Sequence, residues 1–240
     1  MHGGGVDAPV YRRFAERLST DFRTHIYNRR GRGASAPRPT PYTTETEVAD
    51  LDSVVVATGS ARVVAHSAGG FFALEAARTI PLQRLALFDP VVSVDGSFPV
   101  DFMPEFERAI SEGRRMDAVL IMGKGLRNPG YKLPTAVQRP LVRAVMATPA
   151  GRSMVELLPT VPAEAKLASA ADGPAEQWSD ITVPTRFFIG ARSPDYYLPT
   201  AERLAVAMPD ATVEVIPKLG HDAIARAPRG LIAALAGFLR

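Results

Sequence analysis

The sequence contains no cysteine, and this absence removes several kinds of chemistry. Without thiols the chain can form no disulfide, no thiolate metal site and no cysteine nucleophile. Histidine is also scarce: the four are His2, His25, His66 and His221, and no two have metal-ligand spacing together with a carboxylate partner. We therefore expect no metal and no cofactor, so that any catalysis must use hydroxyl, imidazole and carboxylate groups.

Long apolar runs are missing as well. No stretch reaches the roughly eighteen consecutive apolar residues of a membrane-spanning helix. The N-terminus lacks the charged and then apolar pattern of a signal peptide. These absences predict a cytoplasmic protein that does not interact with a membrane.

Positive charge is only slightly in excess. The chain has 28 Lys and Arg against 25 Asp and Glu, a formal net charge of +3, and one local arginine group stands at Arg29, Arg30 and Arg32. Aromatic residues do not interleave this group, which lies between glycines, so a nucleic-acid interface is not indicated. We interpret these arginines as solvated loop residues.

The chain is long enough for a substantial core. With 240 residues, of which 46% are hydrophobic, one domain carrying an insertion is the expected organisation. Short segments typical of strands alternate with segments typical of helices, which is the pattern of an α/β protein with a mostly parallel sheet flanked by helices. The predicted strands are 22–28, 62–65, 82–88, 183–190 and 211–216, and the predicted helices around them are 10–21, 44–58, 69–78, 198–208 and 228–239.

Ser67 stands where a buried strand turns sharply into a helix. Ala65 and Gly69 lie two residues before and two after it, a relaxed form of the G-x-S-x-G turn in which only small residues fit. The amides at the start of helix 69–78 would stabilise negative charge beside the serine. Ser67 is therefore a candidate nucleophile, although a serine that merely caps the helix would give the same local pattern.

Two further polar residues follow predicted strands. Asp89 comes directly after strand 82–88, and His221 comes shortly after strand 211–216. The carboxyl ends of parallel strands meet at one edge of a sheet, which is where ligands bind in open α/β folds. We expect both residues to lie near Ser67.

The alternation stops between 92 and 178. This stretch contains several short helical segments separated by prolines, and we interpret it as a helical lid inserted into a core formed by 1–91 and 179–240. The expected helices are 105–115, 116–121, 136–147, 152–158 and 162–171.

The N-terminal run Met1-His2-Gly3-Gly4-Gly5 has two interpretations. Taken alone, it fits a flexible glycine-rich start. An HGGG-type run beside a serine turn instead supplies an amide to an oxyanion hole, and it normally follows a buried strand. Since no strand precedes it here, the first strands of the sheet are missing, and we hypothesise that the natural chain begins upstream of Met1.

Together these features resemble the α/β-hydrolase family. The resemblance rests on the glycine run 2–5, the arginine and glycine loop 29–35, the serine turn 65–69, the Val-Pro-Thr strand 183–190 and Gly220-His221. It implies a serine hydrolase in which Ser67 attacks a carbonyl, His221 is the base, and the amides of Gly4 and Ala68 form the oxyanion hole. His66 is a weaker candidate base, because a residue adjacent to Ser67 points its side chain away from it.

The carboxylate that orients His221 has two candidates. Many members of the family carry it after the strand corresponding to 186–190, but this chain has Ser193 at that place and Asp195 two residues later. Others carry it one strand earlier, where Asp89 stands. We favour Asp89 and keep Asp195 as the alternative.

The resemblance leaves two functions open. The first is hydrolysis of a small carboxylic ester or related acyl bond through an acyl-enzyme intermediate. The second is a non-catalytic module that uses the same fold to bind a small molecule or act as a receptor. No motif identifies the substrate, and nothing in the sequence specifies the oligomeric state.

Overall fold

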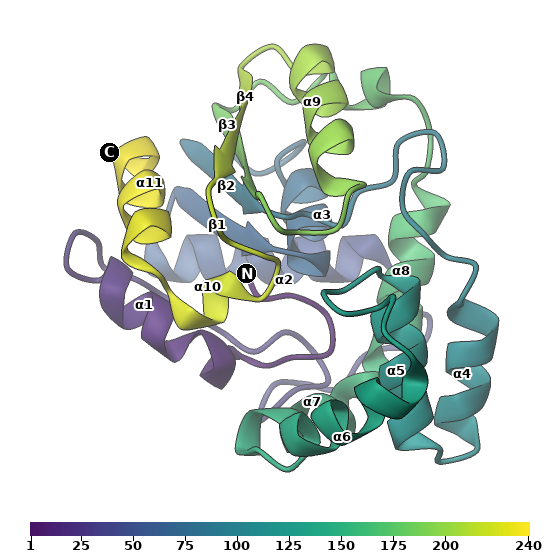
Figure 1. The fold of residues 1–240 in the computed structure, drawn as a ribbon. Helices are drawn as coiled ribbons and strands as arrows, with labels where there is room; N and C mark the ends of the chain where they lie inside the picture. Colours follow the sequence, from purple (N-terminus) through teal and green to yellow (C-terminus); the bar gives the residue numbers. More distant parts are fainter.

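A parallel four-stranded sheet runs through the centre of the computed structural model, which describes residues 1–240 (Figure 1). Its strands lie in chain order: β1 (Arg62–His66), β2 (Arg84–Phe88), β3 (Thr185–Gly190) and β4 (Ala211–Ile216). In the register, His66 lies beside Phe88, Phe88 beside Phe188, and Gly190 beside Ile216. The carboxyl ends of the strands therefore meet at one edge, as the sequence predicted for an α/β fold.

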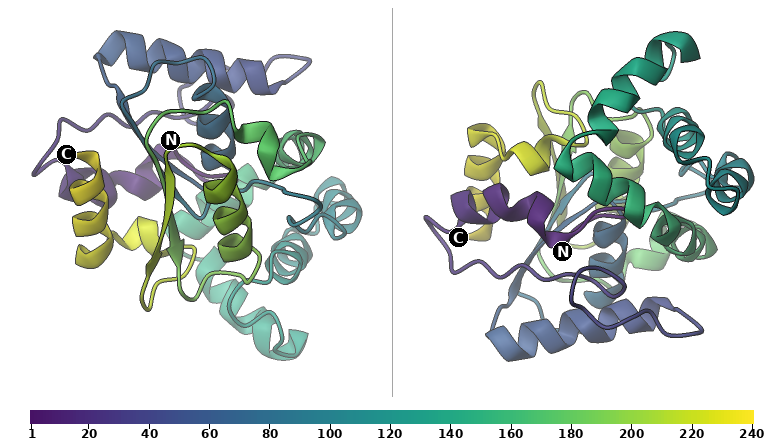
Figure 2. Two further views of the ribbon diagram at one scale, coloured as in Figure 1. Left: turned by 90° about the horizontal axis from the view of Figure 1, so that it is seen from above. Right: turned by 90° about the horizontal axis from the view of Figure 1, so that it is seen from below.

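Helices cover both faces of this sheet (Figure 2). One face packs against α2 (Thr44–Thr58), α3 (Ala68–Ala76) and α9 (Tyr197–Ala207), and the other against the 3₁₀ helix η1 (Ala8–Tyr11), α1 (Arg12–Leu18), α10 (Ala223–Arg226) and α11 (Arg229–Leu239). The alternation of side chains along β2 explains this arrangement, because Leu85 and Leu87 enter the first core and Ala86 and Phe88 enter the second. A strand buried on both faces is apolar throughout.

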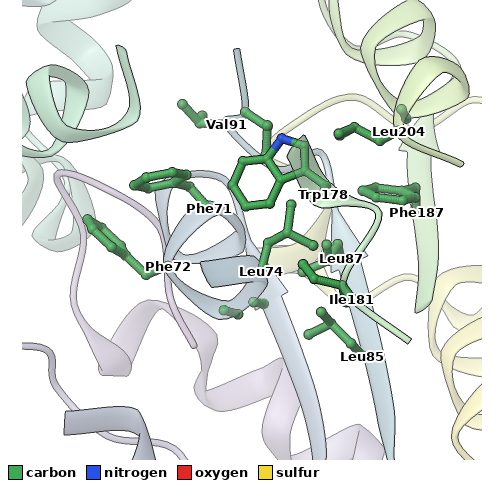
Figure 3. Packing of buried hydrophobic residues seen from close by; sticks show 14 of the residues in the cluster. Phe71, Phe72, Leu74, Leu85, Leu87, Val91, Trp178, Ile181, Phe187 and Leu204 are labelled. Carbon is green, nitrogen blue, oxygen red and sulfur yellow. The ribbon is translucent and has the colours of Figure 1, made fainter. Parts of the chain in front are cut away.

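Trp178 anchors the first core. It is fully buried at the end of the 3₁₀ helix η3 (Ala175–Trp178), just before the chain returns to the sheet. Its ring meets Phe71 of α3 edge to face, with centroids 6.5 Å apart, and lies among Leu74, Leu87 and Phe187 (Figure 3). Burial of this large ring holds the end of the helical segment against α3.

The residues between β2 and η3 form a separate group of helices beside the carboxyl edge of the sheet (Figure 1). All five helices expected here are present, with shifted ends: α4 (Met103–Ser111), α5 (Arg115–Gly125), α6 (Thr135–Met146), α7 (Pro149–Leu157) and α8 (Val161–Ala170), with the 3₁₀ helix η2 (Leu158–Thr160) before the last. The helices α4, α5, η2 and α8 share a small core of their own around Phe106 and Leu158. Pro140 lies inside α6; it removes one backbone donor without ending the helix.

The predicted strand 22–28 is wrong. No residue of this segment pairs in the sheet. A cavity of about 430 Å³, lined by 23–27 and by Arg62, Val63 and Val64, separates the segment from β1. A β-forming sequence needs a partner for its backbone groups, and the residue that bonds the carboxyl end of β1 on this side is Met1, whose carbonyl accepts from the amide of His66.

The predicted helix 44–58 is confirmed as α2, which ends at Gly59 in the left-handed conformation (φ 65°). The four-residue helix α10, just after His221, is absent from the sequence-based prediction. None of the helices combines the length and hydropathy that crossing a bilayer would demand.

Candidate active site

Ser67 lies in a strained turn between β1 and α3. Its backbone has φ 54° and ψ −129°, a conformation that residues with side chains rarely adopt and that is typical of a nucleophile turn. Three backbone hydrogen bonds hold it: the Ser67 amide donates to the carbonyl of Phe88 (3.2 Å), and the Ser67 carbonyl accepts from the amides of Gly70 (2.8 Å) and Val91 (3.0 Å). The turn is thus tied to the end of β2.

Close packing explains the small residues around this turn. A Cβ atom at Gly69 would lie 2.3 Å from the carbonyl oxygen of His2, and one at Gly70 would lie 2.6 Å from the Cβ of Pro90. Neither position can accept a side chain without displacing the backbone. Gly69 therefore lets the N-terminal glycine segment approach the start of α3.

His221 and Asp89 lie within hydrogen-bond reach of one another and of Ser67. The Nε2 atom of His221 is 3.1 Å from Ser67 Oγ, and its Nδ1 atom is 3.2 Å from Asp89 Oδ2. The ring of Tyr197 stacks on the imidazole, with centroids 5.1 Å apart and planes 11° apart. The structure thus brings together three residues that are distant in the sequence.

The environment of His221 tunes its basicity. Burial disfavours the charged imidazole, but the hydrogen bond and the negative charge of Asp89 outweigh burial, so the pKa of His221 lies above its ordinary value of 6.5. A carboxylate only accepts hydrogen bonds, so Nδ1 carries the proton and Nε2 is free to accept one from the Ser67 hydroxyl.

Asp89 is fully buried and accepts three hydrogen bonds. Besides His221, the amide of Gly190 donates to Oδ1 (3.0 Å) and the hydroxyl of Ser193 donates to Oδ2 (2.6 Å). Ser193 stands where the resemblance led us to look for the acid, and its hydroxyl instead donates to Asp89 of the neighbouring strand. No local sequence pattern indicates this contact.

Asp195, the alternative acid, lies elsewhere. Its side chain is 73% exposed and forms an ion pair with Arg127 at 2.8 Å. The structure does not bring Asp195 to His221.

The glycine segment passes directly beside the serine turn. A Cβ at Gly3 would lie 3.0 Å from the Cβ of Ser67, and one at Gly4 would lie 3.5 Å from the Cβ of Ala68. The amide of Arg29 donates to Nε2 of His2, which leaves Nδ1–H to donate to the carbonyl of Gly3 at 2.9 Å. The residues predicted to supply the oxyanion amides, Gly4 and Ala68, are thus neighbours.

His66 cannot serve as the base in this arrangement. Both of its ring nitrogens are engaged, Nδ1 with the hydroxyl of Tyr11 at 2.6 Å and Nε2 with the carbonyl of His221 at 3.1 Å. Burial, followed by the charge of His221, lowers the pKa of His66 well below its ordinary range. The imidazole is therefore neutral and lies beneath the turn, as the sequence predicted.

The interpretation of the arginine group as solvated is wrong for Arg29 and Arg32, whose side chains are fully buried. Arg29 pairs with Glu47 of α2 at 2.8 Å, and Arg32 pairs with Glu164 of α8 at 2.5 Å. Arg38 also pairs with Glu164. Glutamates 18 and 132 residues away along the chain compensate these charges, and such distant pairing is invisible in a local pattern.

Arg30 behaves differently. It forms a two-pronged ion pair with Asp50 at 2.7 and 2.9 Å on the partly exposed surface of α2. It is paired rather than free in solvent, and it does not reach the site.

A cavity of about 410 Å³ opens beside Ser67 and His221. Most of its lining is apolar and comes from the glycine segment and the helical group, including Phe98, Val142 and Met154. Tyr197 of α9 also lines it. Two carboxylates, Glu164 and Asp222, reach the lining, and neither Lys nor Arg does. No group of three or more His, Asp and Glu side chains is arranged to hold a metal ion.

Known proteins resemble this chain in sequence and in fold. The sequence model of the alpha/beta hydrolase family matches residues 1–234. A crystal structure of an alpha/beta hydrolase from Sphaerobacter thermophilus superimposes with a TM-score of 0.82 and 30% sequence identity, covering 100% of this chain and 90% of that one.

Two further relatives carry named activities. N-formylmaleamate deformylase of Pseudomonas putida is 42% identical over 87 residues, which cover 34% of this chain and 32% of the deformylase, so the alignment spans about a third of that enzyme. A thermophilic esterase from Thermogutta terrifontis superimposes with a TM-score of 0.69 at 23% identity, covering 100% of this chain and 87% of the esterase. The second likeness establishes a shared fold.

Proposed function

The chain belongs to the alpha/beta hydrolase family of enzymes, and from this premise we propose that it is a serine hydrolase that cleaves a small carboxylic ester or related acyl bond through an acyl-enzyme intermediate. The observation that carries the proposal is the continuous series of contacts from Ser67 through His221 to the buried Asp89, at the mouth of an apolar cavity. We propose these three residues as the catalytic triad.

Acylation begins with the Ser67 hydroxyl. His221 accepts its proton at Nε2 while Oγ attacks the substrate carbonyl, and the resulting imidazolium is stabilised by Asp89. Hydrogen bonds from the amide of Gly190 and the hydroxyl of Ser193 hold the Asp89 carboxylate in place beside the imidazole. The imidazolium then protonates the leaving group, which departs and leaves the acyl group on Ser67.

The tetrahedral intermediate carries a negative charge on the former carbonyl oxygen. We assign its stabilisation to the amides of Gly4 and Ala68, which belong to neighbouring backbone segments, and to the start of α3. Removal of one such donor typically lowers kcat by roughly 10²- to 10³-fold. Water activated by His221 completes the cycle by hydrolysing the acyl-enzyme.

The helical segment 92–178 acts as a lid in this proposal. It supplies much of the wall of the cavity, including Met122, Val142 and Met154, and exclusion of water strengthens the electrostatic interactions within the site. The apolar lining favours a small uncharged acyl substrate. Of the two lining carboxylates, Glu164 is compensated by buried arginines, so Asp222 is the one that would oppose an anionic substrate. The name of the deformylase relative adds N-acyl amides to the bonds worth testing.

The test measures p-nitrophenyl acetate and butyrate hydrolysis by the full chain and by Ser67→Ala. We expect wild-type turnover, an initial burst of p-nitrophenol equal to the enzyme concentration wherever deacylation is slower than acylation, and loss of all but a residual rate in the variant. A fluorophosphonate probe should label wild type and spare Ser67→Ala. Absence of both turnover and labelling across a panel of esters and N-acyl amides would instead favour a binding module.

A further inference from the structure

Four buried groups form an unbroken series of hydrogen bonds beneath the serine turn. The Gly3 amide lies 3.1 Å from the Tyr11 hydroxyl, that hydroxyl lies 2.6 Å from Nδ1 of His66, and Nε2 of His66 lies 3.1 Å from the main-chain carbonyl of His221. The series joins the glycine segment, the residue before the nucleophile and the loop that carries the base.

The chemistry of the groups determines the direction of every bond. The carbonyl of His221 can only accept, so Nε2 of His66 carries the proton and Nδ1 is an acceptor. The Tyr11 hydroxyl must then donate to Nδ1, and its oxygen is free to accept from the Gly3 amide. All these groups are satisfied at once, although Tyr11 is only 5% and His66 only 6% exposed.

We infer that Tyr11 and His66 are positioning residues, which hold the oxyanion amide and the base in register with Ser67. This inference rests on the proposed function, in which the N–H of Gly4 donates to the oxyanion. The hydroxyl of Tyr11 accepts a hydrogen bond from the amide of Gly3, and Nδ1 of His2 donates one to the carbonyl of Gly3 at 2.9 Å. The Gly4 N–H points opposite to that carbonyl in a trans peptide, so fixing the carbonyl fixes the direction in which Gly4 donates.

The other end of the series acts on the base. His66 donates to the backbone of His221 itself, and the two rings lie 4.5 Å apart. A small movement of this loop would change the distance from His221 Nε2 to Ser67 Oγ. Because both ends act on geometry that matters most in the transition state, their loss should lower kcat more than it raises KM.

The first test compares Tyr11→Phe with Tyr27→Phe. Both replacements delete one buried tyrosine hydroxyl in the N-terminal region, but the Tyr27 hydroxyl has no hydrogen-bond partner. We expect Tyr11→Phe to lower kcat for p-nitrophenyl butyrate roughly tenfold with KM within twofold of wild type. This is less than the roughly 10²- to 10³-fold loss typical of removing an oxyanion donor itself, because Tyr11 acts on Gly4 only through Gly3. Tyr27→Phe should retain wild-type kcat.

A transition-state mimic separates positioning from a merely structural role. Phenylboronic acid forms a tetrahedral adduct with an active-site serine, so its affinity reports the alignment of the oxyanion hole. In Tyr11→Phe this affinity should fall by the same factor as kcat, with rates normalised to the sites that a fluorophosphonate titrates. A purely structural role would reduce the number of titratable sites and leave kcat per site unchanged.

Two substitutions at position 66 separate the two ends of the series. His66→Asn keeps an acceptor near the place of Nδ1 and removes the donor to His221, whereas His66→Gln keeps a donor near the place of Nε2 and removes the acceptor for Tyr11. We expect the affinity for the boronate to stay within about twofold of wild type in His66→Asn and to fall in His66→Gln. The double variant of His66→Gln and Tyr11→Phe should lose no more boronate affinity than either single variant, because both changes break the same hydrogen bond.

Outcomes that overturn the inference are distinct from failure of the proposed function. Wild-type kcat and boronate affinity in Tyr11→Phe would refute a positioning role, as would additive losses in the double variant. Failure of the proposed function would already be visible in the wild-type protein as an absence of turnover and labelling. In that case, ¹⁵N NMR of wild type still tests the bonding itself, since a His66 ring protonated on Nδ1 instead of Nε2 would contradict it.

Discussion

Two polar clusters lie near Gly4, and they have different physical roles. One contains Ser67, His221 and Asp89, and the other contains Glu164 and its buried arginines. A Cβ at Gly4 would lie 2.8 Å from Glu164 Oε2 and 3.5 Å from the Cβ of Ala68, the residue after Ser67, so this glycine adjoins both clusters. Both clusters depend on contacts between residues that are far apart in the sequence.

The clusters differ in how they use charge. The proposed triad borders the cavity, and the imidazole of His221 is 17% exposed. Its hydrogen bonds connect Asp89 through His221 to the hydroxyl of Ser67. The arginine cluster is almost completely buried, with Arg29 and Arg32 fully buried. Glu164 Oε1 forms ion pairs with three guanidinium groups. The first arrangement suits proton transfer. The second joins the loop after η1 and α1 to α8 and thereby the core to the helical segment.

The largest expected effect tests the triad side of this comparison. Asp89→Asn should lower kcat roughly 10⁴-fold, because an amide can donate to Nδ1 and favour the wrong tautomer of His221. Ester hydrolysis measures this loss, and Asp195→Asn serves as the matched control with less than a twofold change. Full activity in Asp89→Asn combined with a large loss in Asp195→Asn would reverse our assignment of the acid.

On the arginine side, Glu164→Gln should destabilise the protein by about 3 kcal/mol or more, because it leaves buried guanidinium charge without its partner. Glu107→Gln, in the same helical segment, removes a partly exposed partner of Lys166 and should cost less than about 1 kcal/mol. Urea unfolding of both variants gives the difference. Equal stabilities would mean that the buried cluster contributes no more than a surface pair.

The stabilities that the two clusters contribute should change in opposite directions with pH. The pKa of His221 is raised above 6.5, so kcat/KM should fall roughly tenfold per pH unit below that raised pKa, as the base becomes protonated. The stability that the His221–Asp89 pair adds is complete below the unfolded-state pKa and is lost as pH rises through the folded-state pKa. An acid limb of the kcat/KM profile whose midpoint lies below pH 6.5 would contradict the raised pKa of His221.

Glu164 responds at the other end of the pH scale. Burial opposes its ionisation, but the charges of Arg29, Arg32 and Arg38 outweigh burial and lower its pKa. Its contribution to stability is therefore present above the unfolded-state pKa and is lost as pH falls through the folded-state pKa. Denaturant unfolding across acidic pH should show this loss in wild type, and Glu164→Gln should remove it.

The smallest expected effect concerns Ser193. Removal of its hydroxyl in Ser193→Ala leaves Asp89 with two of its three donors, so we expect a threefold to tenfold loss of kcat with the fold intact. Steady-state kinetics measures the loss, and Ser179→Ala, at the end of η3 far from the triad contacts, provides the control. A loss equal to that of Asp89→Asn would mean that Ser193 takes part in the chemistry directly.

Local patterns predicted much of the framework correctly. Periodicity and a terminal glycine were sufficient for α2, since those signals act within a few residues. The strand β2 was recognisable because a strand buried on both faces must be apolar. The predicted strand 22–28 is wrong because its β-forming residues have no backbone partner across the neighbouring cavity.

The residues of the candidate site that come just after a strand were predictable from the sequence. The sequence indicated Ser67, Asp89 and His221 because each stands just beyond a strand of a parallel sheet, and the register brings those ends to one edge. Ser193, Tyr11 and Tyr197 carried no local signal. Their roles come from hydrogen bonds or ring contacts to residues from 24 to 104 positions away.

The sequence by itself determined that the chain is an α/β protein with a tight strand-to-helix turn at Ser67, because periodicity and the need for small residues at a tight turn act over short distances. Only the tertiary structure decided that Asp89 rather than Asp195 meets His221, and that Arg29 and Arg32 are buried instead of solvated. Whether a charged group is buried depends on whether a partner from another segment compensates the loss of water, and that partner is chosen by the packing of the whole chain.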